Sequence, residues 1–161
     1  MKSKGNLAKG DFMYYIIITI LVVIDQIIKY FSLTSLKAVG SYPIIEGFFH
    51  LTYVENRGAA FGMLENRQWL FIIITSIVLL GIFLYLRKNI DKRLKLILSV
   101  VAAGAIGNLI DRIYHGFVVD MFDFRGIWQF VFNFADICVV LGGIALIVLL
   151  MVDSTLLDEE Y

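Results

Sequence analysis

The chain contains four long apolar blocks separated by more polar segments. The blocks cover about residues 12–31, 69–86, 94–113 and 134–152. Each is close to the roughly 20 residues that an α-helix needs to cross the hydrocarbon core of a bilayer. Since backbone N–H and C=O groups find no water there, such blocks must form helices and not open strands. The pattern predicts an all-α membrane protein with four transmembrane helices, organised as a single membrane domain over residues 1–161.

Two of the connecting segments are too apolar and too patterned to be plain linkers. Residues 40–66 contain the run His50–Glu55, in which polar and apolar side chains alternate as in a half-exposed strand. A small sheet is expected there, and an unstructured loop is the alternative. Residues 115–133 are rich in aromatic side chains, including Trp128. Aromatic residues favour the headgroup level, so this segment is expected to lie at the membrane interface.

Composition and charge support a membrane location and give an orientation. The chain is 60% hydrophobic, whereas soluble domains are about 45–50% apolar. Its net charge is zero, which does not favour a nucleic-acid partner. Basic residues concentrate in the N-terminal segment (Lys2, Lys4, Lys9) and in residues 87–95, while Arg125 alone is basic between the last two blocks. The N-terminus and the 87–95 loop are therefore expected in the cytoplasm, and four spans return the C-terminus there.

The first apolar block could instead be a cleaved signal peptide. Its basic start fits that interpretation. Its length, its charged residues Asp25 and Lys29, and the lack of a clear A-x-A site after it favour a retained helix.

Charged residues inside or beside the apolar blocks indicate a functional site. Charge at membrane depth costs roughly 2.5–3.5 kcal/mol per residue on insertion scales and usually marks function. With the orientation above, all of these charges fall at the outer membrane boundary, which predicts one site there. They are Asp25, Lys29, Asp111, Arg112, Asp120 and Asp136.

Two of the aspartates, Asp120 and Asp136, flank one outer segment and are candidates for a catalytic pair. Two neighbouring carboxyl groups share a proton, so one can activate water while the other donates to a carbonyl. Asp136 could instead be an ordinary cap or first-turn residue of the fourth helix. Asp123 is a rival to Asp120, three residues further along.

The remaining polar residues near this boundary have supporting roles. Asp25 and Lys29 are spaced to pair on one helix face, and Arg112 could hold a carboxylate in a two-pronged contact. Such groups also form a buried polar lattice that holds helices together. Neutral donors and acceptors are supplied by Asn56, Asn108 and Asn133.

Other chemistries have less support. There are two histidines and no H-E-x-x-H motif, although carboxylates alone could hold Mg²⁺. No G-x-S-x-G motif is present, and a Ser/Lys pair drawn from Ser32, Ser35 and Lys37 is conceivable. A transporter or channel would place charges along a path across the bilayer, whereas these cluster on one side.

Five sequence runs, in this order on a four-span chain, resemble the lipoprotein signal peptidase family, the type II signal peptidases of bacteria. The resemblance covers nearly the whole chain. The runs are Asp25–Lys29, Asn56–Gly62, Gly107–Ile113, Gly116–Asp120 and Phe132–Asp136.

The resemblance implies an aspartic endopeptidase of the bacterial cytoplasmic (inner) membrane, with its active site at the outer face. Such enzymes remove the signal peptide from prolipoproteins that carry a diacylglyceryl group, cutting before the lipidated cysteine. The implied fold has four helices, a small outer β-cradle and a short interfacial helix. The implied partners are lipidated prolipoproteins and membrane lipid, with globomycin as inhibitor and no metal or other cofactor. Unlipidated signal peptides remain an alternative substrate class.

The resemblance also implies roles for particular residues. Asp120 and Asp136 would be the catalytic pair. Small residues on the third block, such as Gly104, Ala105 and Gly107, could let an extended substrate approach closely. Ile137 and Met121 depart from the family's usual residues at those positions. The implied supporting set is Asp25, Lys29, Asn56, Asn108, Asp111, Arg112 and Asn133.

Overall fold

The computed structural model describes residues 7–58 and 67–153, with side chains from residue 12 onward. Lys2, Lys4 and residues 59–66 of the expected cradle lie outside the described residues. Four helices are long and apolar enough to cross a membrane, as the sequence predicts. They are α1 (Leu7–Phe31), α3 (Gln68–Leu86), α4 (Lys92–Tyr114) and α5 (Phe134–Val152).

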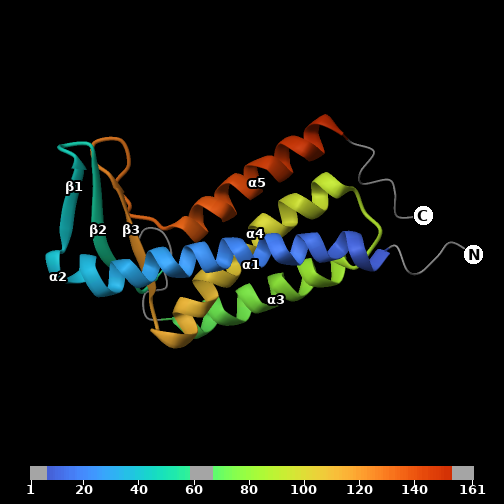
Figure 1. Cartoon of the computed structure of the whole chain (residues 1–161), viewed down its shortest axis with the longest axis horizontal. Helices are drawn as coiled ribbons and strands as arrows, with labels where there is room; N and C mark the ends of the chain where they lie inside the picture. Colours follow the sequence, from blue (N-terminus) through green and yellow to red (C-terminus); the bar gives the residue numbers. More distant parts are fainter. Residues whose placement is uncertain (1–6, 59–66, 154–161) are drawn as a thin grey trace, which may run out of the picture.

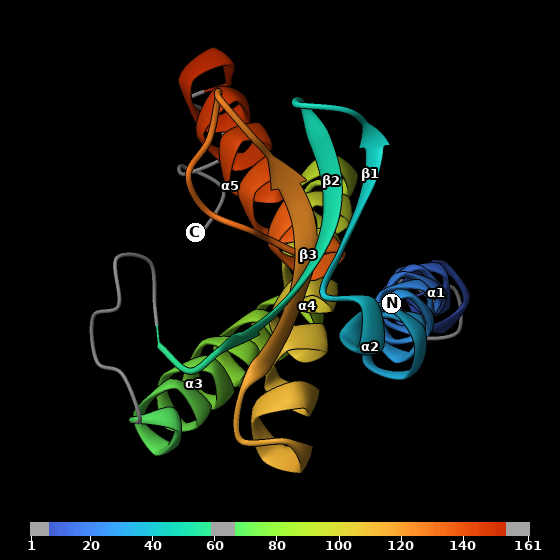
Figure 2. The same cartoon turned by 90° about the vertical axis from the view of Figure 1, so that its left-hand side faces the viewer.

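Helix α4 lies at the centre of the bundle, and α1, α3 and α5 each pack against it (Figure 1). Ala102 and Ala103 of α4 are almost completely buried in a cluster with side chains of α1 and α3. The buried members from those helices are Ile18, Leu79, Ile82 and Leu86. Viewed from the sheet end, α1 and α3 lie on different sides of α4 (Figure 2). A polar side chain on α4 can therefore meet groups from several other elements.

Small residues on α4 allow close approach between helices. A Cβ added to Gly104 would meet the backbone oxygen of Ala135 and lie 2.8 Å from Val139 Cγ2, both on α5. A Cβ added to Gly107 would meet the carboxyl group of Asp25 on α1. The expectation that these glycines make room for substrate is therefore wrong, since helices of this chain fill that space.

A three-stranded antiparallel sheet in the order β1-β2-β3 covers one end of the bundle. Strands β1 (Ser41–Ile45) and β2 (Phe49–Asn56) lie in the segment where a sheet is expected. The third strand, β3 (Val118–Phe124), comes from the 115–133 segment, where the sequence did not indicate one. Four consecutive β3 residues, 118–121, are buried at 2% exposure or less. A strand buried on both faces has no alternating pattern, which is why this one was missed.

Short helices continue α1 at the sheet end. Residues Ser32–Leu36 form a π-helix, η1, and Lys37–Val39 form the short α2. Gly40 then turns the chain into β1 with φ of 78°, a conformation that glycine adopts readily.

Candidate active site

The two candidate catalytic aspartates line one open cavity of about 780 Å³. Asp120 is supplied by β3 and Asp136 by the first turn of α5, and β2 and β3 cross in front of α4 (Figure 2). Asn56 at the end of β2 and Asn108 on α4 line the same cavity. The topology thus brings together side chains that are far apart in the sequence.

Asp120 is buried and held by two amides. Its side chain accepts hydrogen bonds from Asn56 Nδ2 at 2.9 Å and from Asn133 Nδ2 at 2.6 Å. The pKa of Asp120 is raised to about 7, chiefly by burial and also by the nearby charge of Asp136, against the opposing effect of the two amide donors. At neutral pH, a large fraction of the Asp120 side chains therefore carries a proton.

Asp136 takes part in the N-terminal cap of α5. The Asp136 N–H donates to Asn133 Oδ1 at 2.9 Å, and Asp136 Oδ2 accepts the Asn133 N–H at 3.2 Å, which together form a capping box. Asp136 Oδ1 also accepts Asn108 Nδ2 at 2.7 Å. The cap interpretation is correct for Asp136, and it is compatible with a place in the cavity because the cap fixes the carboxyl group there.

Two buried side-chain amides, Asn133 and Asn108, together link the two carboxyl groups. Asn133 is completely buried, and its Nδ2 donates both to Asp120 Oδ1 and, at 3.1 Å, to Asn108 Oδ1. Asn108 in turn donates to Asp136. Each amide thus directs an N–H group at one aspartate, and the two carboxyl groups are the ends of one hydrogen-bonded chain.

Behind this chain lies a buried ion cluster centred on Lys29. Its Nζ lies 3.0 Å from Asp25 Oδ2 and 3.1 Å from Asp111 Oδ2, and it donates to Asn108 Oδ1 at 3.0 Å. The predicted Asp25–Lys29 pair is therefore present. The contact with Lys29 fixes the Asn108 amide with its oxygen toward the lysine and its N–H₂ toward Asp136.

The two carboxylates of the cluster hold the backbone next to the candidate catalytic residues. Asp25 Oδ1 accepts the N–H of Ala135 at 2.9 Å, one residue before Asp136. Asp111 Oδ2 accepts the N–H of Val119 at 2.9 Å, one residue before Asp120. The supporting residues therefore position the α5 start and β3 as well as joining helices.

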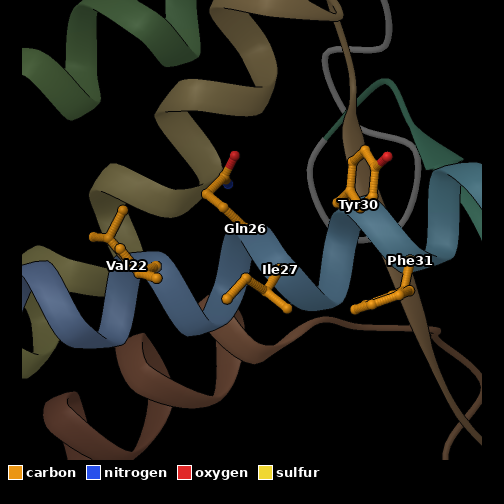
Figure 3. A pocket seen from close by; sticks show the side chains of 6 residues that line it. Val22, Gln26, Ile27, Tyr30 and Phe31 are labelled. Carbon is orange, nitrogen blue, oxygen red and sulfur yellow. The ribbon is translucent and has the colours of Figure 1, made fainter.

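Gln26 belongs to this cluster and was not singled out from the sequence. It extends from α1 toward α4 (Figure 3), where its Nε2 lies 3.2 Å from Asp25 Oδ2, Asp111 Oδ1 and the backbone oxygen of Gly107. A polar amide within the first apolar block was the signal that could have identified it.

Among the described residues, Arg112 does not make the predicted two-pronged contact with a carboxylate. Its Nη1 lies 3.5 Å from the Asn108 backbone oxygen, and its guanidinium lies 5.0 Å from the ring centre of Phe71. Its Nε has no hydrogen-bond partner in the described part of the chain. The carboxylates of the site are already bound by amides, Lys29 and backbone N–H groups, so Arg112 lines the cavity instead.

The alternative residues lie in other surroundings. Asp123 accepts Thr52 Oγ1 at 2.7 Å and Arg125 Nε at 3.0 Å, and among the described residues it is not one that lines the cavity. Ser32 donates to the backbone oxygen of Ile28 on α1, and Lys37 pairs with a glutamate on β2. Residues 7–58 and 67–153 contain no group of three His, Cys, Asp or Glu side chains arranged to hold a metal ion.

Comparisons with known proteins agree with one another. A sequence model of the family described as signal peptidase (SPase) II matches residues 17–152. The chain is 50% identical over 137 residues to the lipoprotein signal peptidase of Clostridioides difficile (strain 630), covering 83% of this chain and 91% of that one. It is 43% identical over 151 residues to that of Fusobacterium nucleatum, covering 91% and 92%. A solved structure of a bacterial membrane enzyme at 2.3 Å resolution is similar, with a TM-score of 0.82, 33% identity and coverage of 92% and 93%.

Proposed function

Because this chain belongs to the signal peptidase II family and removes signal peptides from prolipoproteins, we propose that it does so as an aspartic endopeptidase with Asp120 and Asp136 as its catalytic pair. The observation that carries the proposal is the hydrogen-bonded pair of amides, Asn133 and Asn108, that links the two carboxyl groups beside one cavity. The resemblance of the five sequence runs supports the same two residues.

In the proposed mechanism the pair shares one proton. Asp120 holds it, because burial raises its pKa to about 7. Asp136 accepts a proton from a water molecule, whose oxygen attacks the scissile carbonyl carbon while Asp120 donates its proton to the carbonyl oxygen. The tetrahedral intermediate then collapses: the proton on Asp136 passes to the leaving amine, the C–N bond breaks, and one hydroxyl group returns its proton to Asp120 as the carbonyl re-forms. The asparagines orient both carboxyl groups throughout.

The proposed substrate is a prolipoprotein with a diacylglyceryl group on the cysteine after the scissile bond. The enzyme is placed in the bacterial inner membrane with both termini in the cytoplasm and the active site at the outer face. The arrangement in Figure 1 supports this, since the start of α1, the α3–α4 connection and the end of α5 all lie away from the sheet. The α3–α4 connection contains Arg87 and Lys88, and basic loops favour the cytoplasm.

Purified protein should cleave a lipidated precursor immediately before its cysteine. The lipid anchor holds the scissile bond at the membrane depth of the proposed catalytic pair, Asp120 and Asp136. The same peptide without the diacylglyceryl group should therefore be a poor substrate. Mass spectrometry of both products gives the cut position. Globomycin should block the reaction, and a metal chelator should leave the rate unchanged.

Each contrary outcome has a specific meaning. Equal cleavage of both peptides would favour a peptidase for unlipidated signal peptides. Ion flux through reconstituted liposomes without any cleavage would favour a transporter or channel and reject the proposal.

The cleavage rate should fall as pH rises through about 7, where Asp120 loses the proton that it donates. Stability should respond in the same direction. Between the ordinary value of 3.8 and about 7, the folded state holds this proton and the unfolded state does not, so the free energy of unfolding declines as pH rises. A pH series of kcat/KM, together with unfolding of the Asp120→Asn variant as the control that lacks this group, measures both effects. A rate that stays level well above neutral pH would contradict the assignment of Asp120 as proton donor.

A further inference from the structure

Beside the catalytic cavity, a second hollow runs along the outer surface of α5. Its volume is about 350 Å³, and we call it the α5 furrow. The furrow and the catalytic cavity share four lining residues, so the two adjoin at Asp136. The shared residues are Trp128, Phe132, Asp136 and Val140; Ile137 and Leu141 complete the furrow.

We propose that the α5 furrow binds an acyl chain of the substrate's diacylglyceryl group and thereby sets the lipid specificity of cleavage. This inference rests on the proposed function and adds a substrate subsite to it. The lipid is attached to the residue that follows the scissile bond, so it must leave the catalytic cavity within a few bonds of Asp136. The furrow starts at that residue and continues along α5 to Leu141, a distance of about 7.5 Å at 1.5 Å per residue.

The chemistry of the lining fits a hydrocarbon chain. Apart from Asp136, every lining side chain is apolar or aromatic. Val140 and Leu141 are 56% and 59% exposed, and Trp128 is 56% exposed. Trp is favoured at the headgroup level, where its ring can pack over an acyl chain while its N–H donates to polar groups. The furrow thus joins the polar cavity to the hydrocarbon region.

The aromatic wall of the furrow is held in place by the sheet. Phe132 stacks on Phe124 with ring centres 5.9 Å apart and planes 7° apart, and it also contacts Phe122. Backbone bonds link Phe132 to β3, including Phe122 N–H to Phe132 O at 2.7 Å. Because this aromatic wall is fixed to the strand that carries Asp120, it can align an acyl chain relative to the proposed catalytic pair.

Two other apolar hollows are less suited to this role. One lies along α1 and is lined by Val22, Ile27, Tyr30 and neighbours (Figure 3). Another, between η1 and the sheet, is lined by Met121, which faces the opposite side of β3 from its neighbour Asp120. Neither hollow is lined by Asp120 or Asp136.

The residue after the second aspartate acquires a role in this proposal. Ile137 lines the furrow directly beside Asp136. Its branched apolar side chain adds hydrocarbon surface next to the carboxyl group. Its identity is therefore expected to tune which acyl chains are accepted.

Filling the furrow provides the first test. Leu141→Trp should lower kcat/KM for a precursor with two long acyl chains about tenfold, relative to a precursor whose acyl chains are only a few carbons long, because the long chain loses its alignment. Leu80→Trp on α3 is the matched control, since Leu80 is 60% exposed and Leu141 is 59% exposed. The control should leave the long-chain to short-chain ratio unchanged. An unchanged ratio in Leu141→Trp would overturn the proposal.

Crosslinking provides a second test that needs no cleavage. A precursor with a diazirine at the middle of one acyl chain is bound to the Asp120→Asn variant, irradiated and mapped by mass spectrometry. Labels on residues 137–141 or on Trp128 are expected, and labels confined to α1 or η1 would overturn the inference. Labelling reports only where the acyl chain binds, so the result stands even if the Asp120→Asn variant still cleaves the precursor.

Discussion

Asp120→Asn and Asp136→Asn should each lower the cleavage of a lipidated precursor by about 10³-fold or more, while the protein still folds and inserts. Asparagine cannot accept a proton from water or donate one to a carbonyl, and general acid or base catalysis by one group contributes about 10²–10⁴-fold. The substitution replaces one carboxyl oxygen with an NH₂ group and keeps the shape of the side chain. Single-turnover cleavage in detergent or in reconstituted membranes measures the loss, and thermal unfolding checks the fold.

The chain offers a matched control for this experiment. Asp123→Asn changes the same side chain on the same strand, three residues from Asp120. Asp123 is bound by Thr52 and Arg125 and is not among the described residues that line the cavity, so cleavage should continue at close to the normal rate. Near-normal turnover by either of the first two variants would remove that residue from the catalytic role. Loss of activity in Asp123→Asn alone would make it the better candidate.

The helices could be predicted from the sequence because a bilayer leaves so few options. An apolar block of about 20 residues must form a helix, and α5 begins and ends at the predicted residues, Phe134 and Val152. The strand β3 could not be predicted, because burial on both faces removes the alternation that marked the run around His50. The crowding at Gly104 was also hidden, since a sequence does not say whether a small residue admits a helix or a substrate.

The site could be located from the sequence, but its internal contacts could not. The charges in apolar segments and the order of the spans predict that the polar residues meet at the same end of the helix bundle. The hydrogen-bond partner of each polar side chain depends on positions that differ by a few ångströms, and the periodicity of the sequence does not determine these. Arg112 was therefore assigned a carboxylate that the asparagines and Lys29 already bind. Gln26 could not be assigned to the cluster, because an uncharged amide in an apolar block is a weaker marker of a site than a charge.

The contacts give the buried cluster a positioning role as well as a structural one. Asp25 and Asp111 each bind the backbone N–H of the residue before a candidate catalytic aspartate. Lys29 bonds to both of these carboxylates and to Asn108, which donates to Asp136. The placement of the two candidate catalytic carboxyl groups therefore depends on one lysine.

Lys29→Met should lower the free energy of unfolding by about 3–5 kcal/mol, the typical cost of removing one partner from a buried ion pair. Methionine keeps the length of the side chain but leaves two carboxylates, each 2% exposed, without their cation. The cleavage rate of the folded variant should also fall, because the Asn108 amide loses the contact that orients it.

Lys37→Met is the matched control: Lys37 is 52% exposed beside Glu55, and an exposed pair contributes about 0–1 kcal/mol. Adding Asp25→Asn to Lys29→Met should restore part of the stability by removing one unpaired charge. Unfolding in detergent by heat or denaturant measures all of these variants, and a Lys29→Met protein as stable as the Lys37→Met protein would show that the cluster does not hold the site together.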